Sequence, residues 1–207
     1  MDPADFSLLR SRSVSVSHYA SLSPLLLGRS LLTRDGKPHR SQRNAMNAPF
    51  TPKGLRALGT SAIMKETVET QIDRIATLDE FVALDETRTL ALDIIFRILG
   101  IPQDELSDWR VQYERVLLST FPIQWQLPGM PAWFAARGRA WLAERIHARI
   151  AAIRSDDAAT GLLAEMVRGW DAQEERPEGD DLLVDNVLLL ALAGHETTCL
   201  LYTSDAA

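Results

Sequence analysis

The sequence predicts a mainly α-helical protein, and three observations lead to this fold class. Apolar residues recur every three or four positions through most of the chain, which is the spacing of one face of a helix. Prolines and glycines separate these stretches at the places where helices begin and end. No segment shows the alternation of apolar and polar residues that is typical of a half-buried strand.

In the first half of the chain, short helical stretches alternate with loops. We expect a Ser-rich loop over residues 11–23, a second loop over 28–36, and a helical stretch that Pro52 opens. Helices are expected at residues 5–10, 38–47 and 61–78. The last of these is predicted to be an amphipathic surface helix, with apolar positions at Ile63, Val68, Ile72 and Ile75.

The second half is predicted to hold longer and more deeply buried helices. Residues 81–99 are apolar around most of the helix circumference, and Gly100 ends that helix. Further helices are expected at residues 104–118, 132–153, 156–169 and 180–198, with a turn-rich stretch around 122–131. The helix over 180–198 is apolar on every face beyond its acidic start, so it belongs at the centre of the protein.

Composition and charge exclude some classes of partner. The chain has 207 residues, 46% of them hydrophobic and 24% charged, which is ordinary for a soluble globular protein. Its net charge of -6, with basic residues scattered along the chain, argues against a nucleic-acid partner. The longest apolar stretch, Val187 to Gly194, is far shorter than the roughly 18 residues of a membrane span, so a membrane partner is not expected.

The chain has a single cysteine, Cys199, so it can form no internal disulfide, and we expect a reducing, cytoplasmic location. The last nine residues, 199–207, read CLLYTSDAA. They look like the translation of a transposase sequencing adapter, so we expect the natural sequence to end at Thr198.

The predicted central helix carries an acid and two alcohols in an apolar setting. The segment 193–198 reads Ala-Gly-His-Glu-Thr-Thr. Burying such polar groups costs free energy unless they find partners or have a function. The small pair Ala193 and Gly194 leaves a notch in which a flat group can approach the backbone. At all six positions the segment resembles the oxygen-binding helix of cytochromes P-450, whose pattern is Ala/Gly-Gly-any-Asp/Glu-Thr-Thr/Ser.

The resemblance implies a haem b cofactor and dioxygen as a substrate. In that family this helix crosses one face of the haem, and Ala193 and Gly194 would form the notch that holds dioxygen. Thr197 would donate a hydrogen bond and proton to the bound oxygen, and Glu196 would resupply protons through water. His195 is expected to be a packing or solvent-facing residue and not an iron ligand.

Two other interpretations of these residues are open. Glu196 and Thr197 could merely form hydrogen bonds within a buried helix end, which is the commoner role of a Glu-Thr pair. The run from His195 to Cys199 also resembles the zinc-peptidase pattern HExxH, but cysteine stands where the second histidine is required, so no metal site is assigned. The competing function is a non-enzymatic helical interaction module.

A second motif lies in the segment DGKPHRSQRNAMNAPFTP, residues 35–52. It resembles the P-450 helix under the haem edge, in which a His or Trp stands four residues before an Arg and Pro-Phe follows. His39 and Arg43 fit this spacing and share one helix face, so the resemblance implies that both bind a haem propionate. A solvated surface pair is the alternative.

The resemblance covers nearly all of residues 1–198 and implies the central part of the cytochrome P-450 fold, helices B to I, truncated at both ends. The family's Phe-x-x-Gly-x-Arg-x-Cys loop, which supplies the iron ligand, does not occur in the sequence, so we expect this piece to be inactive alone. The parent enzyme would be a monooxygenase acting on a small apolar organic substrate. Its electron donor would be a ferredoxin or a flavoprotein reductase, and a basic face formed by Lys37, Arg40, Lys53 and Arg56 either meets that donor or is simply solvated.

Overall fold

The computed structural model describes residues 15–16, 24–121, 125–173 and 179–204, with residues 196–204 as backbone only. The α-helices are α3 (Pro24–Leu27), α4 (Gly36–Met46), α5 (Pro52–Ala57), α6 (Thr60–Ile75), α7 (Ala83–Leu99), α8 (Leu106–Leu117), α9 (Pro131–Ser155), α10 (Leu162–Asp171) and α11 (Asp181–Ser204). Short 3-10 turns are η1 (Leu31–Thr33), η2 (Ala48–Phe50), η3 (Gln103–Glu105) and η4 (Leu118–Thr120). No strand occurs in these ranges, so the predicted mainly α class is confirmed. The helix expected at residues 5–10 lies outside the described residues.

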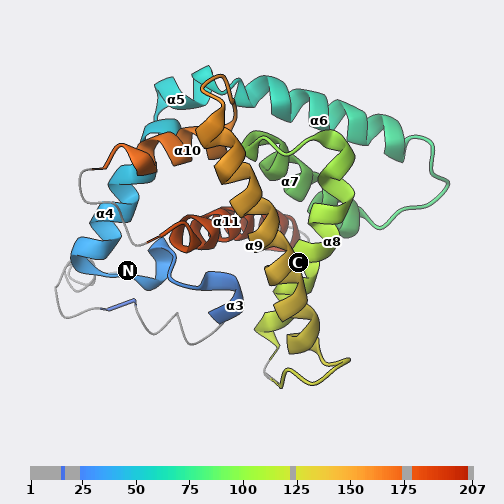
Figure 1. The fold of residues 1–207 in the computed structure, drawn as a ribbon. Helices are drawn as coiled ribbons and strands as arrows, with labels where there is room; N and C mark the ends of the chain where they lie inside the picture. Colours follow the sequence, from blue (N-terminus) through green and yellow to red (C-terminus); the bar gives the residue numbers. More distant parts are fainter. Residues whose placement is uncertain (1–14, 17–23, 122–124, 174–178, 205–207) are drawn as a thin grey trace, which may run out of the picture.

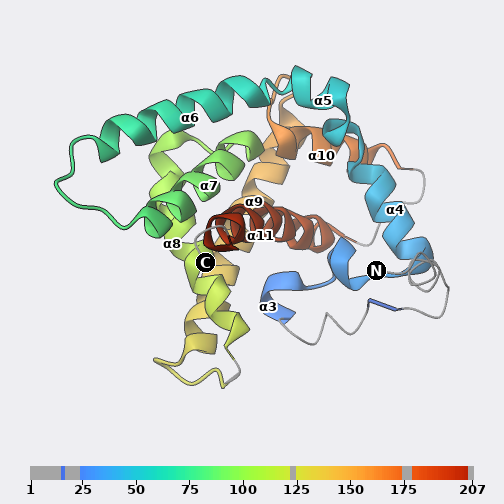
Figure 2. The ribbon, with the colours of Figure 1, turned by 180° about the vertical axis from the view of Figure 1, so that it is seen from behind.

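Helix α11 is the central element, as its apolar sequence predicts. It lies in the middle of the ribbon, with α9 crossing in front of it in Figure 1 and behind it in Figure 2. Its residues Leu182 to Leu188 are all buried. Helix α11 packs mainly on α7, and α8 and α9 form a closely packed pair beside them. Burial of this apolar surface is the main force that holds the helices together.

An aromatic cluster joins α7, α8 and α9 to the central helix. The ring of Phe96 meets those of Trp109 and Tyr113 edge to face, with centroids 5.7 and 6.0 Å apart. The ring of Tyr113 in turn contacts that of His195 on α11, at 6.3 Å and a steep interplanar angle. These geometries are the ones that aromatic rings prefer, and they fix the rotation of α11 relative to α7 and α8.

Helix α6 packs through a polar interface, which the apolar periodicity did not predict. Ile72 is 58% exposed, whereas its neighbour Gln71 is only 8% exposed. The amide of Gln71 donates to Glu86 of α7 over 2.5 Å, and Arg97 of α7 donates to the Thr67 hydroxyl over 2.8 Å. The inward face of α6 therefore combines these buried polar residues with the half-buried Ile63, Val68 and Ile75, whereas the fourth predicted apolar position, Ile72, is exposed.

Two glycines shape the junction between α7 and α10. Gly100 ends α7 in the left-handed region at φ +94°, as predicted. The helix predicted at residues 156–169 begins later, at Leu162, because Gly161 has φ +108° and ψ 166°, which only glycine adopts readily. Before it, the carboxylate of Asp156 accepts from the backbone N–H of Ala158 over 3.0 Å, which closes a turn in place of a helix.

Within the described residues, no helix combines the length and the apolar character needed to cross a membrane.

Candidate functional site

Along one face of α11, burial decreases from Asn186, which is 1% exposed, to Ala193, which is exposed. Asn186, Leu189, Leu190 and Ala193 recur at intervals of three and four residues, so they lie on the same face. Leu189 and Leu190 are half-buried and Ala193 is exposed. Figure 2 views the molecule from the side on which no described helix passes in front of α11. A central helix thus presents an apolar strip that the described residues leave uncovered.

A cavity of about 210 Å³ lies between this face and the segment that contains α4. Its lining residues are Leu31, Arg43, Met46, Asn47, Phe50, Asn186, Leu189 and Leu190. Most of this lining is apolar, and Arg43 contributes the only charge. The arrangement suits a ligand with a flat apolar body and an anionic edge.

The structure places His39 and Arg43 one turn apart on α4. Arg43 is exposed and lines the cavity, whereas His39 is half-buried and is not among the lining residues. Neither side chain makes a hydrogen bond or ion pair with another described residue. The guanidinium of Arg43 can therefore bind an anion without breaking an existing contact.

The other predicted positions of α11 have different surroundings. A Cβ added at Gly194 would be 3.5 Å from the side chain of Ile95 on α7, an ordinary contact, so Gly194 faces α7. His195 is buried against Tyr113, which agrees with the packing role expected for it. Glu196 and Thr197 belong to the turn of α11 that follows Ala193. The structure describes their backbone but not their side chains. Only Ala193 is thus placed on the open face.

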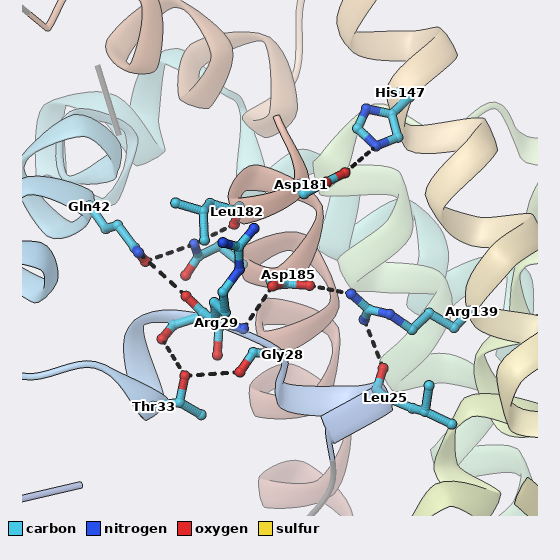
Figure 3. A network of polar contacts seen from close by, with 12 residues as sticks. Leu25, Gly28, Arg29, Thr33, Gln42, Arg139, His147, Asp181, Leu182 and Asp185 are labelled. Atoms are coloured by element: carbon cyan, nitrogen blue, oxygen red, sulfur yellow. Dashed lines mark hydrogen bonds and ion pairs between the residues drawn. The ribbon is translucent and has the colours of Figure 1, made fainter. Parts of the chain in front are cut away.

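Sequence reasoning missed two buried polar residues of α11, Asp185 and Asn186, which are 3% and 1% exposed. We took Asp185 only as part of an acidic helix start. In the structure its carboxylate accepts from the backbone N–H of Arg29 over 2.7 Å and pairs with Arg139 of α9 (Figure 3). Asn186 accepts from the backbone N–H of Leu31 over 2.9 Å. The sequence signal that could have identified this buried contact is the pair of adjacent polar residues within an otherwise apolar helix.

A second, larger cavity of about 830 Å³ lies between α5, α10 and the end of α7. Its two arginines are already engaged, since Arg97 pairs with Glu66 at 2.9 Å and Arg168 pairs with Glu165 at 2.5 Å. No group of three or more metal-binding side chains occurs among the described residues. Lys53 and Asp157 also line this cavity.

The comparisons with known proteins agree on one family. No protein-family model matches the chain. Two curated relatives, cytochrome P-450 BJ-4 of Bradyrhizobium diazoefficiens and its homolog in Sinorhizobium fredii, are each 33% identical over 198 residues, which is 96% of this chain. The chain spans 44% of the length of both relatives.

Solved structures give the same fold. A retinoic acid-bound cyanobacterial CYP120A1 matches with a TM-score of 0.71 at 24% identity, over 90% of this chain and 44% of that one. Epothilone B-bound cytochrome P-450epoK matches with a TM-score of 0.68 at 20% identity, over 94% of this chain and 51% of that one. The helices thus have the arrangement found in part of a cytochrome P-450 fold. Together with the sequence relatives, this places the chain in the cytochrome P-450 superfamily.

Proposed function

We propose that the protein is a haem-dependent monooxygenase, which uses dioxygen and two electrons to insert one oxygen atom into an organic substrate. The observation that carries this proposal is the open apolar face of α11 beside Arg43, in a chain that is 33% identical to cytochromes P-450 over nearly its whole length. A central helix that leaves one apolar face uncovered is suited to a large flat ligand.

The residues of this chain fit a haem b group. Leu189, Leu190 and Ala193 provide an apolar strip for the ring, and the small side chain of Ala193 allows close approach to the helix. Arg43, with His39 one turn before it, supplies charged donors for a propionate. Gly194 stays a predicted member of the notch, although its Cα faces Ile95.

When bound, haem would supply the reductive activation of dioxygen. The role that we propose for residues of this chain is to deliver protons to the oxygen site. In the proposal, Thr197 donates a hydrogen bond from its Oγ1 toward the oxygen site, and Glu196 resupplies the proton from its carboxyl group through water. The position of both residues in the turn of α11 that follows Ala193 supports this proposal.

Electron delivery requires a partner surface, and we propose an acidic ferredoxin or flavoprotein reductase as the partner. Lys37, Arg40, Lys53 and Arg56 are all exposed, on α4 and α5. Positive charge beside the proposed propionate site would steer an acidic donor toward the haem edge. As the resemblance of the sequence implies, we further propose a small apolar organic molecule as the substrate.

The proposal is tested with Thr197→Val in the protein that the whole gene encodes, loaded with haem. Valine keeps the shape of threonine but removes the hydroxyl, so haem binding should be unchanged. Without directed proton delivery, reductant consumption should persist while hydrogen peroxide release rises at the expense of product. The measurement is the ratio of peroxide formed to reductant consumed. The matched control is Thr160→Val, an exposed position remote from α11 in sequence. A ratio equal to wild type in Thr197→Val would remove the relay role.

A further inference from the structure

A buried polar network fastens the segment 25–31 to the central helix. The Asp185 carboxylate accepts a hydrogen bond from the backbone N–H of Arg29, and the Asn186 side-chain oxygen accepts one from that of Leu31. Two consecutive residues of α11 thus hold alternate residues of the segment. Figure 3 shows the Asp185 carboxylate between Arg29 on one side and Arg139 on the other. Arg139 also donates to the carbonyl of Leu25 over 2.7 Å. The segment is thus held at three points.

The same network reaches α4. The Asn186 amide donates to the side-chain oxygen of Gln42 over 3.2 Å, and the Gln42 amide donates to the carbonyl of Arg29 over 3.4 Å. Gln42 is buried and stands next to Arg43. Because Asn186 binds both Leu31 and Gln42, it sets the positions of two elements of the cavity wall at once.

Close packing shows that the segment is fitted to Asp185. Gly28 has φ +49°, and a Cβ at this position would overlap the Asp185 carboxylate. The hydroxyl of Ser30, between the two anchoring residues, is fully buried and has no hydrogen-bond partner among the described residues. The two anchoring hydrogen bonds are donated by the backbone of Arg29 and Leu31, so they depend on the acceptors of α11.

We propose that Asp185 and Asn186 are positioning residues, which hold segment 25–31 and α4 against α11 and thereby fix the wall of the haem-edge cavity. This inference rests on the proposed haem site. Leu31 and Arg43 line that cavity, and Asn186 lines it as well as binding Leu31. Arg139 joins α9 to the carboxylate of Asp185, so α9 is linked to the same network.

The test compares Asn186→Leu with wild type in the whole-gene protein loaded with haem. Leucine keeps the volume but removes the acceptor, and an unpaired buried N–H at Leu31 should loosen the segment. Haem transfer to an excess of apomyoglobin is expected to be on the order of tenfold faster. Hydrogen exchange at the Leu31 amide should also lose its protection. Gly28→Ala disturbs the neighbouring contact between Asp185 and the Arg29 N–H, so it should also accelerate haem transfer.

Arg154→Gln is the matched control, because Arg154 joins α9, α10 and the start of α11 through Asp171 and Asp180 but does not touch the cavity. It should lower the melting temperature while haem transfer stays within about twofold of wild type, a threshold well below the tenfold change expected at Asn186. Wild-type haem transfer in Asn186→Leu, or equal acceleration in Arg154→Gln, overturns the inference. A wild-type protein that takes up no haem would instead overturn the proposed function, and exchange at Leu31 would still decide whether Asn186 holds the segment.

Discussion

Arg43 has a different setting from the other basic residues of α4. It lines an apolar cavity next to α11 and makes no ion pair with a described residue. An exposed guanidinium with no ion pair among the described residues can bind an anionic ligand through charge-assisted hydrogen bonds. His39 lies one turn earlier on the same helix, so it can approach the same ligand from the edge of the cavity.

The double variant His39→Ala with Arg43→Ala should therefore hold haem less tightly in the whole-gene protein. Each charged hydrogen bond to a propionate contributes about 1.5 to 3 kcal/mol, so the loss in affinity should exceed tenfold. Fluorescence quenching during haem titration of the apoprotein measures it. Arg40→Ala is the control, because Arg40 is exposed on α4 and does not line the cavity. Unchanged haem affinity in the double variant would remove both residues from the proposed site.

At the scale of elements, helix identity could be predicted well, whereas some helix faces and ends could not. The apolar run of α7 and its glycine stop, and the central place of α11, follow from local sequence. The polar part of the inward face of α6 does not follow from local sequence. Gln71 is held inward by its hydrogen bond to Glu86 of α7, and apolar periodicity carries no information about that partner. The start of α10 depends on Gly161, whose conformation is set where it meets the end of α7.

The candidate site shows the same division. The spacing of His39 and Arg43 and the sequence of segment 193–198 pointed to one region, and the structure brings Arg43 beside the face that carries Ala193. The roles of Asp185 and Asn186 could not be predicted, because their partners lie about 155 residues away in the chain. Only the folded arrangement shows that a charge in an apolar helix is paired with Arg139.

The joint between α8 and α9 makes a pH-dependent contribution through Glu105. Burial raises the pKa of this carboxyl, but hydrogen bonds from Arg149 and Trp109 outweigh it and hold the pKa below its ordinary value of 4.5. The guanidinium of Arg149 lies 2.8 Å from the Glu105 carboxylate, and the indole N–H of Trp109 donates to the same carboxylate over 3.1 Å. Because the folded pKa is the lower one, the contribution to stability is complete above the unfolded pKa and is lost as the pH falls through the folded pKa.

Glu105→Gln should therefore lower the free energy of unfolding at pH 7 but make little difference at a pH below the folded pKa. Urea unfolding of the variant and of wild type, followed by circular dichroism from pH 7 downward in acid steps, gives this difference directly. Asp108→Asn removes an exposed carboxylate in the first turn of the adjoining α8, which has no ion pair or hydrogen bond among the described residues, so it should leave the profile unchanged. A wild-type advantage that is constant with pH would contradict the assignment.

At the scale of the whole molecule, charged contacts meet at both the start and the middle of α11. Arg154 at the end of α9 bonds to Asp171 of α10 at 2.8 Å and to Asp180, just before α11, at 2.7 Å. Arg139 of the same helix pairs with Asp185 further along α11. Helix α9 is thus fixed to α11 at two levels on one side, and on the side that faces the viewer in Figure 2 no described helix passes in front of α11.

The position of α11 limits which segment can supply a cysteine ligand to a haem iron. Cys199 is the single cysteine of the chain and belongs to α11, two positions beyond Thr197. If haem binds along the face of α11 that carries Ala193, a thiolate ligand for its iron would have to come from a segment other than α11. The 207-residue chain alone, supplied with haem, reduced and exposed to carbon monoxide, should therefore give no thiolate-type absorption band. The whole-gene protein treated in the same way should give it. A thiolate band from the 207-residue chain that disappears in Cys199→Ser would show that α11 lies differently on the haem and would refute the proposed orientation of the site.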